Sequence, residues 1–401
     1  MKAVILAAAP SERLRPFTET RAKPMIRVAG TTILEYMMTA LQGAGIRDIL
    51  VVVNHMRASI EEDFGHGHRL GLSIDYIVQD KLDGIGGALR RCARELKDEP
   101  FLLIYGDVLA TGFPFGRLQE EFTEHGGAVA AVTLPRASAE FGNVYLGQDM
   151  KIEGFVEKPS GRRLANHVLA GIFLLPSAVF GMLSKAKDDI EQVYQGLIGE
   201  GRLHGTLWDG GWIDITRPWH ILSANQMLMD LWDGSRIHQS VLMKGQVHLE
   251  GAVHIEEGVT IEAGTVIKGP VFIGRGSYIG NNCLLRGYTS LGPESVVGYG
   301  TELKNCVLFG RSTLGRLSFI GDSVIGERVH LGTGVATVNN LKDRGEISVR
   351  DGEGTLATSM RKLGAFIGDD TWIGSRHVLA PGTRIHAGYH APDRITILDE
   401  F

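Results

Sequence analysis

The fold of this chain is decided by the stretch Ile273-Gly274-Arg275-Gly276-Ser277-Tyr278-Ile279-Gly280-Asn281-Asn282-Cys283-Leu284-Leu285, in which an aliphatic residue returns at every sixth position. The full series comprises Leu249, Ile255, Ile261, Ile267, Ile273, Ile279, Leu285, Leu291, Val297 and Leu303, then, after slips of one residue, Leu308, Leu314, Ile320, Ile325 and Leu331, and later Ile367 and Ile373. Apolar residues return every third or fourth position in an amphipathic helix and every second in a half-buried strand. A period of six therefore indicates neither a helix nor an ordinary sandwich.

Glycine often follows the aliphatic residue, as in Ile279-Gly280 and Leu291-Gly292. The pattern resembles the hexapeptide repeat of left-handed parallel β-helices, in which each hexapeptide forms one face of a triangular coil, the aliphatic residue points inward and glycine fits the corner. We therefore expect a left-handed β-helix over residues 236–401. The resemblance also implies a homotrimer or a multiple of three. The repeat lapses between Ala336 and Lys362, where a polar segment is expected to leave the coils as a loop.

Residues 1–235 have a different hydrophobic pattern, in which short apolar strands alternate with helical segments. The expected strands are Ala3–Leu6, Ile49–Val53, Ile74–Val78, Phe101–Tyr105, Ala128–Thr133, Val144–Leu146 and Ala170–Leu174, and the expected helices include Ile33–Ala44, Gly86–Leu96 and His220–Leu231. This alternation predicts a layered α/β domain with a mostly parallel sheet. Ligands of such sheets bind beyond the carboxyl ends of the strands, where the loops after Leu6 and Tyr105 belong.

The loop after the first strand reads Leu6-Ala7-Ala8-Ala9-Pro10-Ser11-Glu12-Arg13-Leu14-Arg15-Pro16 and is followed by Lys23-Pro24-Met25. It resembles the signature of sugar-phosphate nucleotidyltransferases, roughly L-A-A-G-x-G-T-R-L-R-P followed by P-K-P-M, which implies a Rossmann-like nucleotidyltransferase domain. Ala9 and Ser11 stand where the family has glycine. Near the other end, Arg361-Lys362-Leu363-Gly364-Ala365-Phe366-Ile367-Gly368-Asp369 resembles archaeal bifunctional sugar-1-phosphate nucleotidyltransferase/acetyltransferases, so the likeness covers nearly the whole chain.

The resemblance implies transfer of a nucleotidyl group from a nucleoside triphosphate to a sugar-1-phosphate, with release of pyrophosphate and with Mg²⁺. Asp107, in Tyr105-Gly106-Asp107, and Asp214, in Trp212-Ile213-Asp214, match the acidic elements that hold the metal, and carboxylate oxygens suit Mg²⁺. Arg13 and Lys23 match the cations that contact the triphosphate and are the expected catalytic residues. The alternative is that the two aspartates cap strands or helices and that the two cations lie on a solvated loop.

The nucleotide is expected to contact Leu6, Ala8, Ala9 and Ser11 of the loop, together with Gln79 and Gly84. The last two begin a segment that resembles Q-x-x-x-x-G-T-A-x-A, although Ile85 replaces its threonine. A carboxamide can pair with the O4/N3 edge of uracil or thymine, which favours UTP or dTTP.

The sugar phosphate is expected to contact Glu157 and Lys158, which match a Glu-Lys-Pro element, and Gly142, which matches a family glycine. Leu169 replaces an asparagine that commonly binds the sugar in the family.

The β-helix carries changes where the bifunctional relatives have an acetyltransferase element, G-H-x-S-Y. Here the segment reads Gly315-Arg316-Leu317-Ser318-Phe319, so arginine replaces histidine and phenylalanine replaces tyrosine. Arginine stays protonated at neutral pH and cannot act as a general base, so we expect acetyl transfer to be lost. Two alternatives stay open: a bifunctional enzyme with His330 or His377 as base, and a non-catalytic regulatory protein that binds sugar nucleotides.

Composition and charge exclude several other classes of function. A net charge of −5 gives no reason to expect nucleic-acid binding, and no apolar run is long enough for a membrane span. Three scattered cysteines, Cys92, Cys283 and Cys306, indicate buried thiols rather than disulfides or a zinc site. The N-terminus lacks the pattern of a signal peptide, so a cytoplasmic location is expected.

Overall fold

The computed structural model describes residues 1–9, 11–54, 56–96, 98–134, 142–156, 167–351 and 354–394. Two compact units divide the chain, and neither is continuous in sequence. The first combines Met1–Pro10, Ala22–Met25 and Ile33–Asp214, and the second combines Ser11–Arg21, Ile26–Thr32 and Ile215–Phe401. The predicted division near residue 235 stays a prediction.

A mixed sheet forms the centre of the first unit. Its strands in the described residues are β1 (Lys2–Leu6), β4 (Asp48–Val53), β5 (Ser73–Val78), β6 (Phe101–Tyr105), β8 (Ala128–Thr133), β9 (Asn143–Leu146), β10 (Ile152–Val156), β11 (His167–Leu175) and β12 (Leu203–Leu207). They follow the order β10-β9-β11-β6-β1-β4-β5, with β8 between β11 and β12. The pairs β6–β1, β1–β4, β4–β5 and β8–β12 are parallel, whereas β9, β10 and β11 pair antiparallel. The predicted α/β fold is confirmed.

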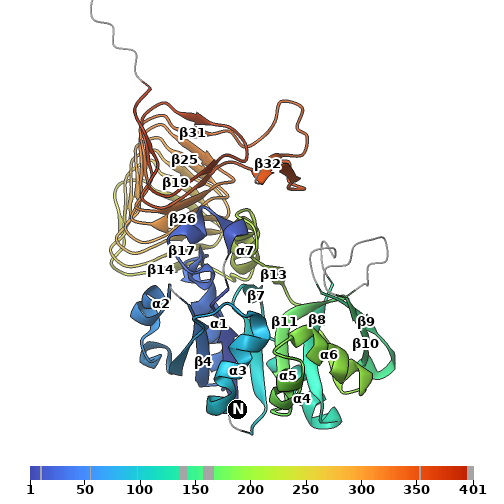
Figure 1. Ribbon diagram of the computed structural model, residues 1–401. Coiled ribbons are helices and arrows are strands. Elements are labelled where there is room, and N and C mark those ends of the chain that lie inside the picture. Colours follow the sequence, from blue (N-terminus) through green and yellow to red (C-terminus); the bar gives the residue numbers. More distant parts are fainter. Residues whose placement is uncertain are drawn as a thin grey trace, which may run out of the picture. The chain divides into compact units, whose positions relative to one another are not determined.

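Helices cover the sheet of the first unit (Figure 1). They are α1 (Ile33–Gly43), α2 (Arg57–Phe64), α3 (Gly84–Leu96), α4 (Phe115–His125), α5 (Val179–Lys185) and α6 (Ile190–Gly199). Leu89 of α3, Leu183 of α5 and Leu197 of α6 join one buried cluster with the strands, so these three helices share a face of the sheet. In the part of the chain that the structure describes, no helix is long and apolar enough to cross a membrane.

The second unit is a stack of coils built from three parallel sheets. The first sheet contains β14 (Arg236–Ile237), β17 (Val253–Ile255), β20 (Val271–Ile273), β23 (Thr289–Leu291), β26 (Val307–Gly310), β29 (Val324–Glu327), β34 (Phe366–Ile367) and β37 (Arg384–Ile385). The second contains β15 (Leu242–Met243), β18 (Thr260–Ile261), β21 (Tyr278–Ile279), β24 (Val296–Val297), β27 (Thr313–Leu314), β30 (His330–Leu331), β35 (Trp372–Ile373) and β38 (His390–Ala391). The third contains β16 (His248–Glu250), β19 (Val266–Lys268), β22 (Leu284–Leu285), β25 (Glu302–Lys304), β28 (Phe319–Gly321), β31 (Ala336–Thr337) and β36 (Val378–Leu379).

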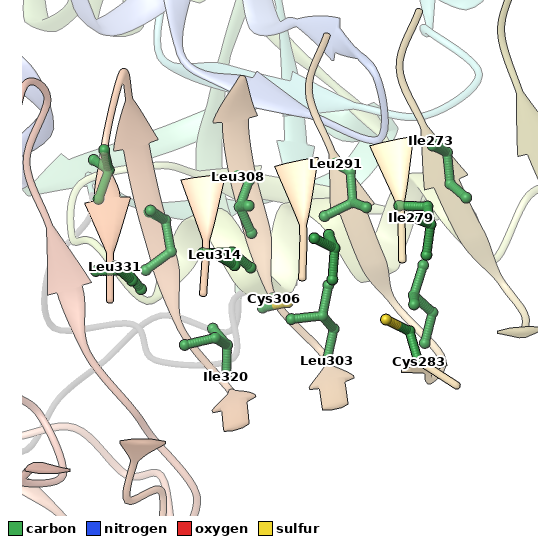
Figure 2. Packing of buried hydrophobic residues seen from close by; sticks show 14 of the residues in the cluster. Ile273, Ile279, Cys283, Leu291, Leu303, Cys306, Leu308, Leu314, Ile320 and Leu331 are labelled. Atoms are coloured by element: carbon green, nitrogen blue, oxygen red, sulfur yellow. The ribbon is translucent and has the colours of Figure 1, made fainter. Parts of the chain in front are cut away.

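The aliphatic residues of the repeat form the core of these coils. Ile273, Ile279 and Leu285 lie on three different sheets and are each 0% exposed. Each pairs in register with the residue one coil further on, as Ile273 does with Leu291. Figure 2 shows the side chains of Ile273, Ile279 and Leu291, with those of Cys283 and Cys306, in the buried interior. The predicted left-handed β-helix is confirmed, and the three cysteines are buried and free as predicted.

The polar segment after Ala336 leaves the coils, as predicted, but it is not structureless. It forms an antiparallel hairpin of β32 (Ser348–Asp351) and β33 (Gly354–Ala357), which Figure 1 shows beside the coils. The stack continues across it, because β29 pairs directly with β34.

Shorter elements complete the chain. The first unit also holds the strands β7 (Val108–Ala110) and β13 (Trp212–Asp214) and the 3-10 helices η3 (Lys23–Met25), η4 (His68–Leu70) and η6 (Gln148–Met150). The second unit also holds η1 (Glu12–Leu14), η2 (Phe17–Glu19), the hairpin of β2 (Arg27–Val28) and β3 (Thr31–Thr32), and the helix α7 (His220–Met229).

Candidate active site

A buried lysine lies between two aspartates in the first unit. The Nζ atom of Lys23 is 2.6 Å from Oδ2 of Asp107 and 3.6 Å from Oδ1 of Asp214. The Lys23 side chain is 7% exposed, whereas Asp107 and Asp214 keep 27% and 20% of their surface. Three of the predicted site residues, separated by up to 191 positions (214 − 23), therefore meet at one point.

Strand pairing brings the two aspartates together. Strands β7 and β13 pair antiparallel with Asp214 opposite Val108, and Asp107 directly precedes β7. The backbone N–H of Gly106 donates to the carbonyl of Leu6, at 3.0 Å. A Cβ atom at Gly106 would collide with that carbonyl, so glycine is required where the chain passes the end of β1.

A cavity of about 290 Å³ lies beside Asp107. It is lined by Leu6, Ala8, Ala9, Gln79, Leu82, Gly84, Ile85, Ala88, Tyr105, Gly106 and Asp107. Five of the six residues predicted to contact the nucleotide are in this lining, together with one predicted metal ligand. The cavity lies at the carboxyl ends of β1, β5 and β6, where α/β sheets bind their ligands.

The Gln79 side chain in this cavity is held in one orientation. Its Nε2 donates to Oδ1 of Asp83 at 3.0 Å and to the carbonyl of Gly84 at 2.9 Å. Both partners only accept, so the amide nitrogen must face them and the carbonyl oxygen of Gln79 is left to accept from another donor. Arg91 in turn donates to both oxygens of Asp83. The hydrogen bond from Gln79, and with it those from Arg91, outweighs burial and lowers the pKa of Asp83.

The sequence reasoning missed Asp83 and Arg91. Their signal was present, because an acidic residue just before a helix and an arginine two turns into it lie on one side of its first turns. Nothing in that spacing, however, names Gln79 as the group that Asp83 orients.

A second cavity, of about 200 Å³, adjoins Asp214. It is lined by Ile85, Tyr105, Val108, Gly142, Phe155, Leu169, Ala170, Gly171, Ile190, Glu191, Tyr194, Trp212 and Asp214. Gly142 and Leu169, which the sequence connects with sugar binding, both lie here. Glu191, in the first turn of α6 after the capping residue Asp189, is a carboxylate that the sequence reasoning missed. Glu157 and Lys158 lie outside the described residues.

Two predicted residues of the loop, Ser11 and Arg13, belong to the second unit. Arg13 lies on η1 and is exposed. The neighbouring Glu12 is 3.7 Å from Arg15, the residue that follows this short helix, so a nearby cation partly offsets its negative charge.

The residues that bear on acetyl transfer lie on the β-helix. Arg316 is exposed and Phe319 lies on β28. The ring of His330 stacks on that of Trp372, with centroids 3.8 Å apart, and burial lowers the pKa of His330. The Nδ1 atom of His377 is 3.0 Å from the carbonyl oxygen of Gly374.

Asp107 and Asp214, which flank Lys23, are the residues here that could hold a divalent metal. Within the described ranges no group of three or more histidine, cysteine, aspartate or glutamate side chains could hold an ion alone. Asp107 and Asp214 nevertheless converge on a single ammonium group, so both carboxylates face one position that favours positive charge. Mg²⁺ commonly takes one or two carboxylates and completes its shell with substrate phosphates and water.

Comparison with known families agrees with this geometry. The Nucleotidyl transferase family matches residues 2–230, and the GMPPB C-terminal domain matches residues 267–350. The chain therefore belongs to the nucleotidyltransferase family, and the predicted family and enzyme class are confirmed.

Individual relatives extend over almost the whole chain. The Bifunctional protein GlmU of Methanococcus maripaludis is 34% identical over 395 residues, which cover 96% of this chain and 92% of the relative. A bifunctional sugar-1-phosphate nucleotidylyltransferase/acetyltransferase of Sulfurisphaera tokodaii is 32% identical, with 96% and 94% covered.

Solved structures match somewhat more than half of the chain. A proposed glucose-1-phosphate thymidylyltransferase from Bacillus anthracis superposes with a TM-score of 0.54 and 26% identity, covering 58% of this chain and 97% of that one. A UTP-bound UGPase from Acinetobacter baumannii, at 20% identity and a TM-score of 0.52, shares the fold. These relatives support the predicted sugar-1-phosphate nucleotidyltransferase function.

Proposed function

We propose that this protein joins a uridylyl or thymidylyl group to a sugar-1-phosphate. The observation that carries the proposal is the convergence of Lys23, Asp107 and Asp214 between two adjoining cavities. The first cavity would hold the nucleotide and the second the sugar phosphate. In the reaction, a phosphate oxygen of the sugar-1-phosphate attacks the α-phosphorus, the bond from that phosphorus to the oxygen of the β-phosphate breaks, and pyrophosphate leaves.

The residues would act by positioning and by charge. Asp107 and Asp214 would hold Mg²⁺, which supplies positive charge that neutralises the phosphates when bound. Lys23 and Arg13 would contact the triphosphate, where cations stabilise negative charge that builds up on transferring oxygens. No covalent protein nucleophile is required, because both reactants are held in line.

The base preference follows from Gln79. Its fixed carbonyl oxygen would accept from the N3–H group of uracil or thymine. Cytosine has no hydrogen at N3, and the larger purines would need more of the 290 Å³ cavity. A panel of nucleoside triphosphates should therefore give the highest kcat/KM with UTP or dTTP, and a higher value with CTP would refute this preference.

The decisive measurement is pyrophosphate release with Mg²⁺ from a panel of nucleoside triphosphates and sugar-1-phosphates. Wild type should turn over, whereas Lys23→Ala and Asp107→Ala should not. Asp209→Ala is the matched control, because the Asp209 side chain is 83% exposed and belongs to neither cavity lining. Nucleotide binding without turnover for every pair would favour the non-catalytic alternative, and Ala9→Gly with Ser11→Gly would then test whether the altered loop is the cause.

We further propose that acetyl transfer is absent. Arg316 stands where the bifunctional relatives have histidine, and a guanidinium cannot act as a general base, while the imidazole of His330 is covered on one face by Trp372. Incubation with acetyl-coenzyme A and amino-sugar phosphates should release no free thiol. Thiol release that His330→Ala or His377→Ala abolishes would establish the bifunctional alternative.

We also propose that the protein forms a homotrimer, or a multiple of three, through contacts between the outer surfaces of the coils. The second sheet turns apolar side chains outward in two successive coils and again in a later one: Tyr278 and Val296 are each 38% exposed and Trp372 is 46% exposed. A second copy of the chain would cover such a stripe. Light scattering should give three chains per particle, or a multiple of three, and Trp372→Glu should weaken the assembly.

A further inference from the structure

The segment Ser11–Arg21, called here the signature segment, is packed on the β-helix. It interrupts the sequence of the first unit yet belongs to the second. Leu14 and Phe17 are both 0% exposed. The Phe17 ring meets the rings of Phe309 and Phe366 edge-on, with centroids 5.2 and 6.5 Å apart. The coils that contain Phe309 and Phe366 therefore pack against the apolar side chains of this segment.

A buried carboxylate of the β-helix holds the end of the signature segment. Arg21 donates to Oδ2 of Asp369, whose side chain is 2% exposed, and the Thr20 hydroxyl donates to the same oxygen at 2.7 Å. The Arg21 guanidinium also lies 3.6 Å from Glu327 and 4.6 Å from the centre of the Phe309 ring. The other oxygen of Asp369 accepts from the backbone N–H of Glu327 at 2.8 Å, which fixes the carboxylate in place.

Glu19, two residues before Arg21, makes a second contact with the β-helix. One carboxylate oxygen of Glu19 accepts from the backbone N–H of Ala387 at 2.9 Å, and the other is 2.7 Å from Nδ1 of His386. Charged hydrogen bonds of this kind contribute more than neutral ones. The segment is thus tied to two successive coils, through residues about 350 positions away in sequence (369 − 21 = 348).

We propose that Asp369 is a positioning residue for nucleotidyl transfer, acting through Arg21 on the segment that carries Arg13. This rests on the proposed function, in which Arg13 contacts the triphosphate. When the binding-competent form of a protein is only partly populated, apparent affinity falls by that fraction. The β-helix therefore contributes to the reaction as well as to assembly, because it keeps the signature segment in one conformation.

The test is Asp369→Asn, which preserves shape. The remaining oxygen can still accept from Glu327, while the new amide group faces Arg21 and Thr20, which are both donors. Asp370→Asn is the matched control: Asp370 is the next residue and accepts from Arg328 at 2.6 and 2.8 Å, but it has no bond to the signature segment among those described.

In pyrophosphate-release kinetics, Asp369→Asn should lower kcat/KM for the nucleoside triphosphate about tenfold, equivalent to about 1.4 kcal/mol. The KM for the sugar-1-phosphate should not change, and Asp370→Asn should behave as wild type. Kinetics of Asp369→Asn equal to those of its control would overturn the proposal, as would an equal rise of both KM values. If Asp369→Asn does not fold, Glu19→Gln applies the same test at the second contact.

Trypsin provides a readout that needs no activity. It cleaves after exposed arginine, and the bond between Arg13 and the buried Leu14 should open only when the segment leaves the coils. Cleavage there should be faster in Asp369→Asn than in Asp370→Asn. Wild type without turnover would refute the proposed function and the positioning role with it, while cleavage rates would still report whether Asp369 anchors the segment.

Discussion

Replacing Lys23 with methionine removes the only positive group that the described structure places between Asp107 and Asp214. With an effective dielectric constant of about 20, Coulomb's law gives about 6 kcal/mol for the 2.6 Å pair and about 5 kcal/mol for the 3.6 Å pair, before the ammonium is desolvated. Desolvation cancels much of this, and removing one partner of a buried pair costs about 3–5 kcal/mol. Because both carboxylates keep some exposure, we expect Lys23→Met to lower the free energy of unfolding by about 3 kcal/mol.

The assay is urea unfolding followed by the helical circular-dichroism signal, since α1 to α6 belong to the first unit. Arg69→Met is the control: Arg69 is 2.7 Å from Glu35 in the same unit, but its side chain is 59% exposed, so the loss should be at most about 1 kcal/mol. Mg²⁺ should stabilise Lys23→Met more than wild type, by about 2.7 kcal/mol at about a hundred times its Kd. A loss no larger than that of Arg69→Met, or no effect of Mg²⁺, would refute the reasoning.

Three further predictions concern the cavity, the core and the thiols. Asp83→Leu should raise the KM for the nucleoside triphosphate about tenfold, because Gln79 loses one of the two acceptors that fix its amide; unchanged kinetics would show that Gln79 needs no support from Asp83. Leu291→Ala, at a site that is 0% exposed, should cost about 2–5 kcal/mol in urea unfolding of the β-helix, and a cost below about 1 kcal/mol would mean that the coils close over the gap. Burial raises the pKa of Cys92 and of Cys306 to about 12, so both thiols stay protonated at neutral and mildly alkaline pH and should react with a thiol reagent only after unfolding. Rapid labelling of the native protein at either position, located by mass spectrometry, would contradict that expectation.

The β-helix could be predicted from the sequence because its rule is local and repeated. Ile273, Ile279 and Leu285 each meet the same requirement, an aliphatic side chain in the interior of a triangular coil, so one pattern determines many residues. Element bounds in the first unit were also close, as for the helix expected at Gly86–Leu96 and found at Gly84–Leu96. The helix starts earlier because Gly84, with a φ of 80°, can turn the chain into it.

The candidate site could be predicted only in part. Motifs identified Lys23, Asp107 and Asp214 separately, and the structure brings them together, but no motif shows that the lysine neutralises both carboxylates. The contact between Arg21 and Asp369 has no periodicity and joins residues 348 positions apart (369 − 21), so it depends on the whole β-helix being in place. Glu191 was missed for a similar reason, since only the packing of α6 brings it to the second cavity.

The hairpin of β32 and β33 leaves the coils between β31 and β34, and strands of the coil before it pair directly with strands of the coil after it, as β29 does with β34 and β31 with β36. The hydrogen bonds between the coils therefore do not depend on how much chain lies between Asn340 and Arg361, and lengthening an existing loop adds only a slowly growing entropic cost. The hairpin is therefore a site that should tolerate insertion. A new peptide or a whole domain could be inserted there while every inward-facing residue of the coils keeps its register. A protein engineer could use this loop for such insertions.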